Sequence, residues 1–172
     1  MFQKGDYVIY GHNGICRIQD ITTLDIPGVD KNRKYYLLKP VYASQSTVYT
    51  PVDTAEASFR HAMSKEEADS LIKSIPNIPI IPLSDEKTLE QTYKKYMRSN
   101  RSEAWVQLIK TIYLRKEKRI MTGHKVTALD SRYFDLAEAS LYGELSIALG
   151  KPKEEIKTYI ANCIDSLPQS AD

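Results

Sequence analysis

The chain has 172 residues, of which 42% are hydrophobic and 27% are charged, with only 2 cysteines. This length can bury the core of one domain or of two small ones, and the composition is that of an ordinary globular protein. The sequence has no signal-peptide pattern and no apolar run of membrane-spanning length, so we expect a cytoplasmic protein that does not insert into a membrane. Cys16 and Cys163 are too few for a disulfide framework and are expected to be buried, reduced thiols.

The net charge of +2 is unevenly distributed along the chain. Between Lys87 and Lys125, eleven Lys and Arg residues stand against three Glu residues, so this segment carries +8 and the rest carries −6. Such an asymmetry is typical of a face that binds a polyanion. Solvated basic helix faces are the alternative explanation, but the acidic remainder of the chain favours a binding function.

The first third of the chain predicts β-strands. Two β-rich runs, Tyr7–Tyr10 and Ile15–Ile21, flank a loop that contains Asn13-Gly14, and Asn-Gly predicts a tight hairpin turn with positive φ. Two further runs, Tyr35–Leu38 and Thr47–Thr50, are each followed by a proline and predict two more strands. About four short strands at close spacing indicate a small SH3- or Tudor-like β-barrel or a twisted antiparallel sheet.

From Ser64 onward the apolar residues follow a helical period. Ser64 and Glu67 form a capping box that opens a short helix to about Ile75. Three prolines in the next seven residues then predict an extended linker, whose isoleucines should hold it against the helical domain. Four more helices are expected over about 85–98, 102–120, 128–149 and 152–167. Thr127 is expected to cap the start of the third of these, and Gly150 is expected to end it.

The helix over 102–120 has an apolar face that includes Trp105, Leu108, Ile112 and Tyr113, so we expect these side chains in the core. The predicted fold class is α+β, with a small N-terminal sheet followed by an all-α domain of about five helices. The predicted boundaries are 1–55 for the sheet domain, 56–83 for the connecting helix and linker, and 84–172 for the helical domain.

Basic residues concentrate at two places in the helical domain. The first group lies between two helices, and the second group lies at the end of the next helix, where cations also complement the helix dipole. Phosphate contacts by such residues are salt-dependent and independent of sequence. Tyr93 and Tyr96 lie beside the first group and could insert at a base step, although tyrosines at helical spacing are more often core residues.

No catalytic or cofactor-binding pattern is present in the sequence. The three histidines have no partner at metal-ligand spacing, and the chain has no phosphate-binding glycine loop. Cys16 lies in a predicted strand that would bury it, which disfavours a nucleophile. We therefore expect a protein without catalytic activity, metal or cofactor.

Several of these motifs resemble the CarD/CdnL family of bacterial transcription regulators. The opening motif is Gly5-Asp6-x-Val8-x-Tyr10 followed by His12-x-Gly14, and a related module occurs in transcription-repair coupling factors. Tyr35–Lys39 and Val48–Pro51 are similar to later strands of the family, and Leu141–Leu145 is similar to one of its helices.

The resemblance implies a Tudor-like domain that binds the RNA polymerase β subunit and a helical domain that binds upstream promoter DNA. Together these would modulate the stability of the open complex. An exposed sheet edge offers a physical route for the first contact, and either Tyr35–Lys39 or Thr47–Pro51 is expected to form it. The candidate polymerase-binding residues are Tyr35, Leu37, Lys39, Val48, Tyr49, Thr50 and Pro51.

For DNA, the resemblance points to an apolar wedge at Leu89, where better-known family members have a tryptophan. The basic residue expected two positions later is Gln91, and an arginine that the family directs towards polymerase aligns with Tyr49. The candidate DNA-binding residues are Leu89, Tyr93, Lys94, Lys95, Arg98, Arg101, Arg115, Lys116, Arg119 and Arg132.

The sequence thus predicts a monomeric, nucleoid-associated regulator that bridges RNA polymerase β and the phosphate backbone or minor groove of promoter DNA. Two alternatives stay open: an RNA- or ribosome-associated binding module, and a protein–protein adaptor without DNA binding.

Overall fold

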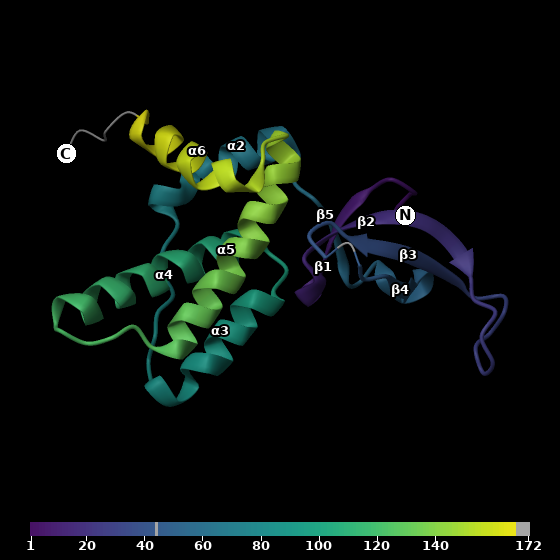
Figure 1. Ribbon diagram of the computed structural model, residues 1–172, viewed down its shortest axis with the longest axis horizontal. Helices are drawn as coiled ribbons and strands as arrows, with labels where there is room; N and C mark the ends of the chain where they lie inside the picture. Colours follow the sequence, from purple (N-terminus) through teal and green to yellow (C-terminus); the bar gives the residue numbers. More distant parts are fainter. Residues whose placement is uncertain (44, 168–172) are drawn as a thin grey trace. The chain divides into compact units, whose positions relative to one another are not determined.

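The computed structural model describes residues 1–43 and 45–167 and has the predicted α+β architecture. The chain divides into two compact units, Met1–Ala62 and Met63–Asp172. The first unit contains the strands, and the second contains the long helices (Figure 1). Residues 168–172 of the predicted helical domain lie outside the described residues. Within the described ranges, no helix is both long and apolar enough to span a membrane.

The N-terminal unit is built on one open, five-stranded antiparallel sheet with the strand order β4-β3-β2-β1-β5. The short helix α1 (Val52–Ala55) follows β4. The fifth strand has only three residues, which is too few for an alternating pattern to predict it. Of the two predicted forms, the open sheet is the one observed. The strands are β1 (Tyr7–Tyr10), β2 (Ile15–Thr23), β3 (Lys34–Pro40), β4 (Val48–Pro51) and β5 (Phe59–His61).

The predicted opening hairpin is confirmed, but its turn differs from the prediction. β1 and β2 pair antiparallel with Ile9 opposite Ile15. Their connection contains a 3₁₀ turn, η1 (Gly11–Asn13), and the Tyr10 N–H donates to the Gly14 carbonyl at 3.0 Å. Positive φ occurs at Gly11 and Gly14, and Asn13 does not adopt it. The two glycines supply the left-handed residues that the loop needs, so a two-residue primed turn is not formed.

The core of the N-terminal unit lies on one face of the sheet. Alternate residues of β2 and β3 point into it, and Cys16, Tyr36 and Leu38 are fully buried. Phe2 and Phe59, from the two ends of the unit, stack edge-on with ring centroids 5.5 Å apart. Burial raises the pKa of the Cys16 thiol to about 11, so this cysteine is an inert core residue, as expected.

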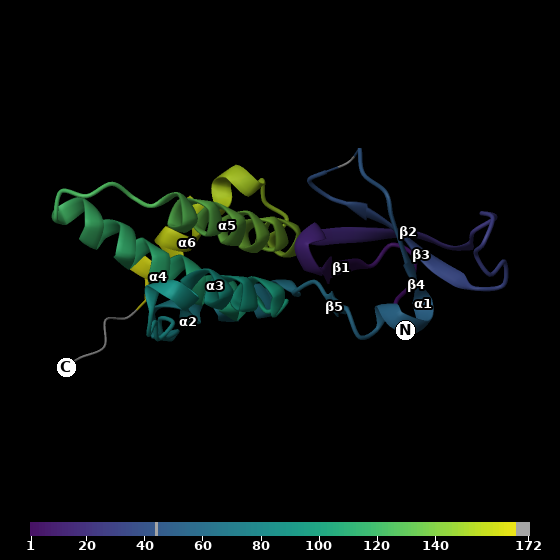
Figure 2. The ribbon, with the colours of Figure 1, turned by 90° about the horizontal axis from the view of Figure 1, so that it is seen from below.

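The helical unit is arranged around α5, which contacts every other long helix of the unit (Figure 1). α2 and α6 lie side by side near the C-terminal half of α5, and α3 and α4 contact it elsewhere, as Figure 2 shows from a second direction. The helices are α2 (Lys65–Ser74), α3 (Leu89–Arg98), α4 (Ser102–Met121), α5 (Ala128–Leu149) and α6 (Lys153–Asp165), with 3₁₀ turns at η2 (Ile75–Asn77) and η3 (Glu86–Thr88).

Most helix ends follow the predicted capping residues. The Ser64 hydroxyl accepts from the Glu67 N–H, and the Glu67 carboxylate accepts from the Ser64 N–H, which confirms the capping box. Thr127 caps α5, and Gly150 ends it in the left-handed conformation. The start of α3 differs: Asp85 caps the turn η3, and the α-helix proper begins only at Leu89.

The helical core matches most of the predicted apolar face. Trp105, Leu108 and Ile112 are buried, but Tyr113 is 52% exposed, so its prediction as a core residue is wrong. Tyr113 follows Trp105 by eight positions and therefore lies about 80° further around the helix, beyond the buried stripe. Cys163 is only half-buried, because α6 lies at the edge of the unit and fully buries a single residue, Ile156.

The proline-rich segment after α2 crosses α4 and is fixed to it by hydrogen bonds (Figure 1). The Ile81 N–H donates to the Thr111 hydroxyl at 2.9 Å, and both residues are buried. The Lys110 ammonium donates to the carbonyls of Ile75 and Ile78 at 2.7 and 2.6 Å. This segment is therefore a fixed part of the helical unit.

Candidate functional site

The strands β3 and β4 present an outer face that the core of the N-terminal unit does not cover. Leu37 lies opposite Tyr49, and Tyr35 lies opposite Pro51. Tyr49 is 48% exposed, and the other three are half-buried. Because side chains alternate along a strand, these four residues share the face opposite the core. We call them the outer strip: Tyr35, Leu37, Tyr49 and Pro51.

β4 is an edge strand, since it pairs with β3 alone. An edge strand offers a row of main-chain N–H and C=O groups that a partner strand can pair with. The segment Thr47–Pro51 therefore lies at an edge of the sheet, in agreement with one of the two predictions. The other expectation, an edge at Tyr35–Lys39, is wrong because β3 lies between β2 and β4.

Two of the predicted polymerase-binding side chains point inward. Thr50 is buried, and Val48 packs against the core cluster of the sheet. The Thr50 side chain is therefore not accessible to a partner, the half-buried Val48 side chain is turned towards the core, and their main chain is what the edge offers. The Thr50 hydroxyl oxygen is buried without a hydrogen-bond partner among the described residues.

The outer face continues from β4 across the sheet as a basic row. Lys39 is exposed and lies opposite Arg17 of β2, and the Arg17 guanidinium lies 5.9 Å from the centre of the Tyr7 ring. Arg17 is not one of the predicted polymerase-binding residues. Strand alternation identifies it, because Cys16 and Ile18 on either side face the core.

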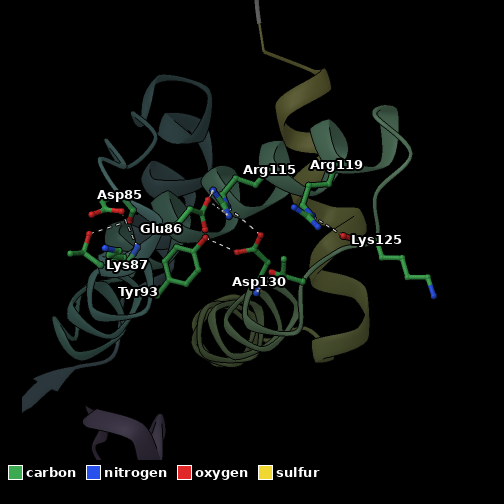
Figure 3. Close-up of polar contacts among 10 residues, drawn as sticks. Asp85, Glu86, Lys87, Tyr93, Arg115, Arg119, Lys125 and Asp130 are labelled. Carbon is green, nitrogen blue, oxygen red and sulfur yellow. Dashed lines mark hydrogen bonds and ion pairs between the residues drawn. The ribbon is translucent and has the colours of Figure 1, made fainter.

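In the helical unit, four polar side chains form a network that is buried at Tyr93 and Asp130 and reaches the surface at Glu86 (Figure 3). The Tyr93 hydroxyl donates to Asp130 Oδ1 at 2.7 Å, and Arg115 Nε donates to Asp130 Oδ2 at 3.2 Å. The two terminal nitrogens of Arg115 donate to Glu86 Oε1, each at 3.3 Å. Burial raises the pKa of Tyr93, and the Asp130 carboxylate raises it further. The network joins η3, α3, α4 and α5.

This packing contradicts the prediction that Leu89 and Tyr93 contact DNA. Both side chains are buried in the core of the helical unit, at 4% and 0% exposure. They are four positions apart on α3 and so lie on the same inward face of that helix. Tyr96 is half-buried against the same core. A side chain on this face would have to leave the core before it could enter a base step.

Four predicted DNA-binding cations surround the turn between α3 and α4 and remain accessible. Lys94 and Arg101 make exposed ion pairs with neighbouring glutamates at 3.7 and 3.5 Å. Exposed pairs of this kind contribute only about 0–1 kcal/mol, so a phosphate can replace the glutamate. Lys95 and Arg98 are exposed and make no ion pair within the described ranges. We call this group the turn cations: Lys94, Lys95, Arg98 and Arg101.

The other four predicted cations are held by contacts inside the helical unit. Arg115 belongs to the buried network, and Arg119 Nε donates to the Lys125 carbonyl at 2.7 Å (Figure 3). The Lys116 ammonium lies 4.1 Å from the centre of the Phe134 ring. Arg132 makes an exposed ion pair at 2.8 Å with Glu90, the carboxylate that also pairs with Lys94, so Arg132 lies beside the turn cations. Along α4, positions 101 and 115 are about 20 Å apart, so Arg115, Lys116 and Arg119 form a separate group.

The helix motif Leu141–Leu145 contains a buried carboxylate with a structural contact. Glu144 is fully buried, and its Oε2 accepts from the Met63 N–H at 2.8 Å. Met63 is the first residue of the helical unit and directly precedes the cap of α2. Glu144 thus fixes the point at which the chain enters this unit.

The described residues contain no group of three or more His, Cys, Asp or Glu side chains placed to hold a metal ion. The predicted binding residues that remain accessible lie on two surfaces, the outer strip with its strand edge and the turn cations.

Comparison with known families gives one match. Residues 2–64 match the family model described as the CarD-like/TRCF RID domain, and the matched segment ends at the cap of α2. A comparison with curated proteins gives no match. The RID family is a protein-interaction domain that interacts with the RNA polymerase β subunit. Residues 2–64 of this chain therefore match a CarD-like/TRCF RID domain, and this match supports a transcription-related role in binding RNA polymerase.

Proposed function

We propose that this protein is a transcription regulator that binds the RNA polymerase β subunit through its N-terminal unit and upstream promoter DNA through its helical unit. The bridge would modulate the stability of the open complex at transcription initiation. The observation that carries the proposal is the exposed edge of β4, with the outer strip beside it, inside the segment that matches the RID family.

The polymerase half of the proposal rests on two kinds of contact. Main-chain pairing at β4 supplies affinity, and side chains on alternate positions supply specificity. Tyr49 is the most exposed member of the outer strip, and exposed aromatic residues are frequent anchors of protein interfaces. The second sheet edge, β5, has only three residues and no comparable aromatic strip.

The test uses the full chain and purified β subunit in a binding titration. Tyr49→Ala should weaken binding about tenfold or more, the loss expected for an aromatic anchor. Two matched controls should bind like the wild type. Tyr42→Ala removes a tyrosine of equal exposure, 48%, outside β4, and Thr50→Val changes the neighbouring residue on the opposite face of the strand. If Tyr49→Ala binds normally, or if the wild type does not bind β, the polymerase assignment fails.

The DNA half rests on the turn cations, which are exposed and grouped, in a segment of +8 charge. Four cations that each neutralise one phosphate give a slope of about −3.6 for log affinity against log salt on duplex DNA. Because Leu89 and Tyr93 are buried, binding is expected to show little sequence preference.

Fluorescence anisotropy of the full chain with labelled duplex or forked DNA measures this slope. The double variant Lys95→Glu/Arg98→Glu should reduce the slope by about two, whereas Lys157→Glu on α6, an exposed lysine of the same unit, should leave it unchanged. Absence of binding at low salt would support an adaptor without DNA binding. Preference for structured RNA over promoter DNA would support an RNA- or ribosome-associated module.

A further inference from the structure

The helical unit has an apolar groove that neither half of the proposed function uses. Its cavity of about 420 Å³ lies between the proline-rich segment and α4, and its walls include Ile80, Pro82 and Leu83 on one side and Leu114 on the other. Ile80 and Leu114 are about half-exposed.

The groove is preformed, because three residues within about one turn of α4 hold its proline-rich wall. Gln107 donates to the Pro79 carbonyl at 3.2 Å, Lys110 donates to the Ile78 carbonyl, and Thr111 accepts from the Ile81 N–H. Prolines limit the other conformations of this wall. A partner would therefore lose little free energy in ordering the site.

A basic cavity of about 310 Å³ adjoins the apolar groove and shares Arg115 and Lys118 with it. Arg119 also lines the basic cavity (Figure 3 shows Arg115 and Arg119). Arg119 uses its Nε–H for the Lys125 carbonyl, and its terminal nitrogens have no partner within the described part of the chain. Three cations here face one carboxylate, that of Glu86, which is already paired with Arg115.

The face of α4 that borders the groove carries a second exposed apolar side chain. Leu114, Lys118 and Met121 are spaced at i, i+4 and i+7 and share one face of the helix, with the lysine between the two apolar residues, and Met121 is almost fully exposed. This face is about 10 Å long, which corresponds to two helical turns. Exposed apolar residues grouped beside a groove with a charged border are typical of a protein-binding site, whereas single exposed apolar residues are ordinary.

We infer that the groove between Ile80–Leu83 and Leu114–Met121 binds an acidic amphipathic helix of a partner protein. The apolar face of that helix fills the groove, with anchors spaced like those of α4, and its acidic residues meet Lys118 and Arg119. The positive charge of the basic cavity favours an acidic partner, and the two-turn face of α4 matches the length of a short helix.

The inference is tested with the full chain and two labelled peptides of roughly 15 residues, enough for a few helical turns. Both peptides carry Leu at i, i+3, i+4 and i+7, and the remaining positions are mostly Glu in one and mostly Lys in the other. Fluorescence anisotropy should show binding of the acidic peptide and at least tenfold weaker binding of the basic one. Leu114→Asp should abolish binding, and Lys118→Glu should weaken it severalfold at low salt.

Leu136→Asp is the matched control, since Leu136 on α5 is 47% exposed against 49% for Leu114. This variant should bind the acidic peptide like the wild type, and both variants should retain the circular dichroism spectrum and melting temperature of the wild type. The inference is overturned if the acidic peptide does not bind, if both peptides bind equally, or if Leu136→Asp loses binding as Leu114→Asp does.

Two further results would assign the groove to another occupant and also overturn the inference. Loss of self-association in Leu114→Asp, measured by analytical ultracentrifugation, would show that a second copy of the chain covers it. Displacement of the acidic peptide by duplex DNA, with weaker DNA binding by Leu114→Asp, would make the groove part of a nucleic-acid surface. The β-binding titration with Tyr49→Ala is independent of these outcomes.

Discussion

Removing the Asp130 carboxylate should be among the most destabilising single changes in the helical unit. Asp130 is fully buried and accepts one hydrogen bond from Tyr93 and one from Arg115. Asp130→Ala leaves the buried Tyr93 hydroxyl without an acceptor and Arg115 without its shorter ion pair, while Glu86 still pairs with Arg115.

The magnitude follows from these two contacts. A hydrogen bond to a charged group contributes about 1.5–3 kcal/mol, and breaking a buried ion pair costs about 3–5 kcal/mol. Because the Arg115 side chain keeps 23% exposure and its second partner, we expect a loss of about 3–4 kcal/mol for Asp130→Ala. Tyr93→Phe removes only the hydroxyl, and Asp130 keeps Arg115, so we expect about 1–1.5 kcal/mol.

Urea unfolding of the full chain, followed by circular dichroism, measures both losses. The double variant Tyr93→Phe/Asp130→Ala should lose at least about 1 kcal/mol less unfolding free energy than the sum of the two single variants. The reason is that Tyr93→Phe, made in the absence of Asp130, removes a buried hydroxyl that no longer has an acceptor. Asp135→Ala, an exposed carboxylate on the same helix, should stay within about 0.5 kcal/mol of the wild type. A loss below about 1 kcal/mol for Asp130→Ala, or strictly additive losses, would refute the reasoning.

Four other outcomes are expected from the same physical arguments. Lys110→Met should cost about 1–2 kcal/mol in urea unfolding and speed proteolysis near the prolines, because the ammonium no longer holds two linker carbonyls; unchanged proteolysis would contradict this. Glu144→Ala should cost about 2–3 kcal/mol and Glu144→Gln clearly less, since Gln still offers the Met63 N–H an acceptor; equal losses would argue against that contact. Thr50→Val should raise stability by about 1 kcal/mol by removing an unpaired buried hydroxyl, and a loss would show that the hydroxyl is satisfied. At pH 8 the Cys16 thiol, with its pKa of about 11, should react with a thiol reagent only after unfolding, well after Cys163, and simultaneous reaction would contradict its burial.

Local sequence signals predicted much of the fold because they act over few residues. The capping box at Ser64, the cap at Thr127 and the glycine at position 150 each involve a chemistry confined to one helical turn. The hairpin turn was mispredicted although its strands were right. Asn-Gly is only one way to supply positive φ in a hairpin loop. Gly11 also supplies it, and it lies four positions before Ile15, where the second strand begins.

The candidate site was less predictable because exposure depends on packing between distant segments. The sequence placed seven residues at the polymerase-binding strands, but strand alternation and the position of β3 inside the sheet decide which side chains face out. Likewise, the position of Tyr93 beside a lysine pair gives no local sign that Asp130, 37 positions later, accepts a hydrogen bond from its hydroxyl in the core. Helical spacing alone could not separate free cations from those held by internal acceptors.

The buried network also constrains how the helical unit can act on DNA. The family resemblance places an apolar wedge at Leu89, yet Leu89 begins the helix whose inward face carries Tyr93, and both lie in one core with Ile112. Exposing that face would break the bond between Tyr93 and Asp130 and open the core of α3, α4 and α5, a cost comparable to much of the stability of a small domain, about 5–15 kcal/mol. The unit therefore favours contacts that leave the core closed, and the exposed turn cations provide them. Under the proposed function, binding of that kind would let polymerase choose the promoter, while the helical unit would add salt-dependent affinity wherever DNA passes it.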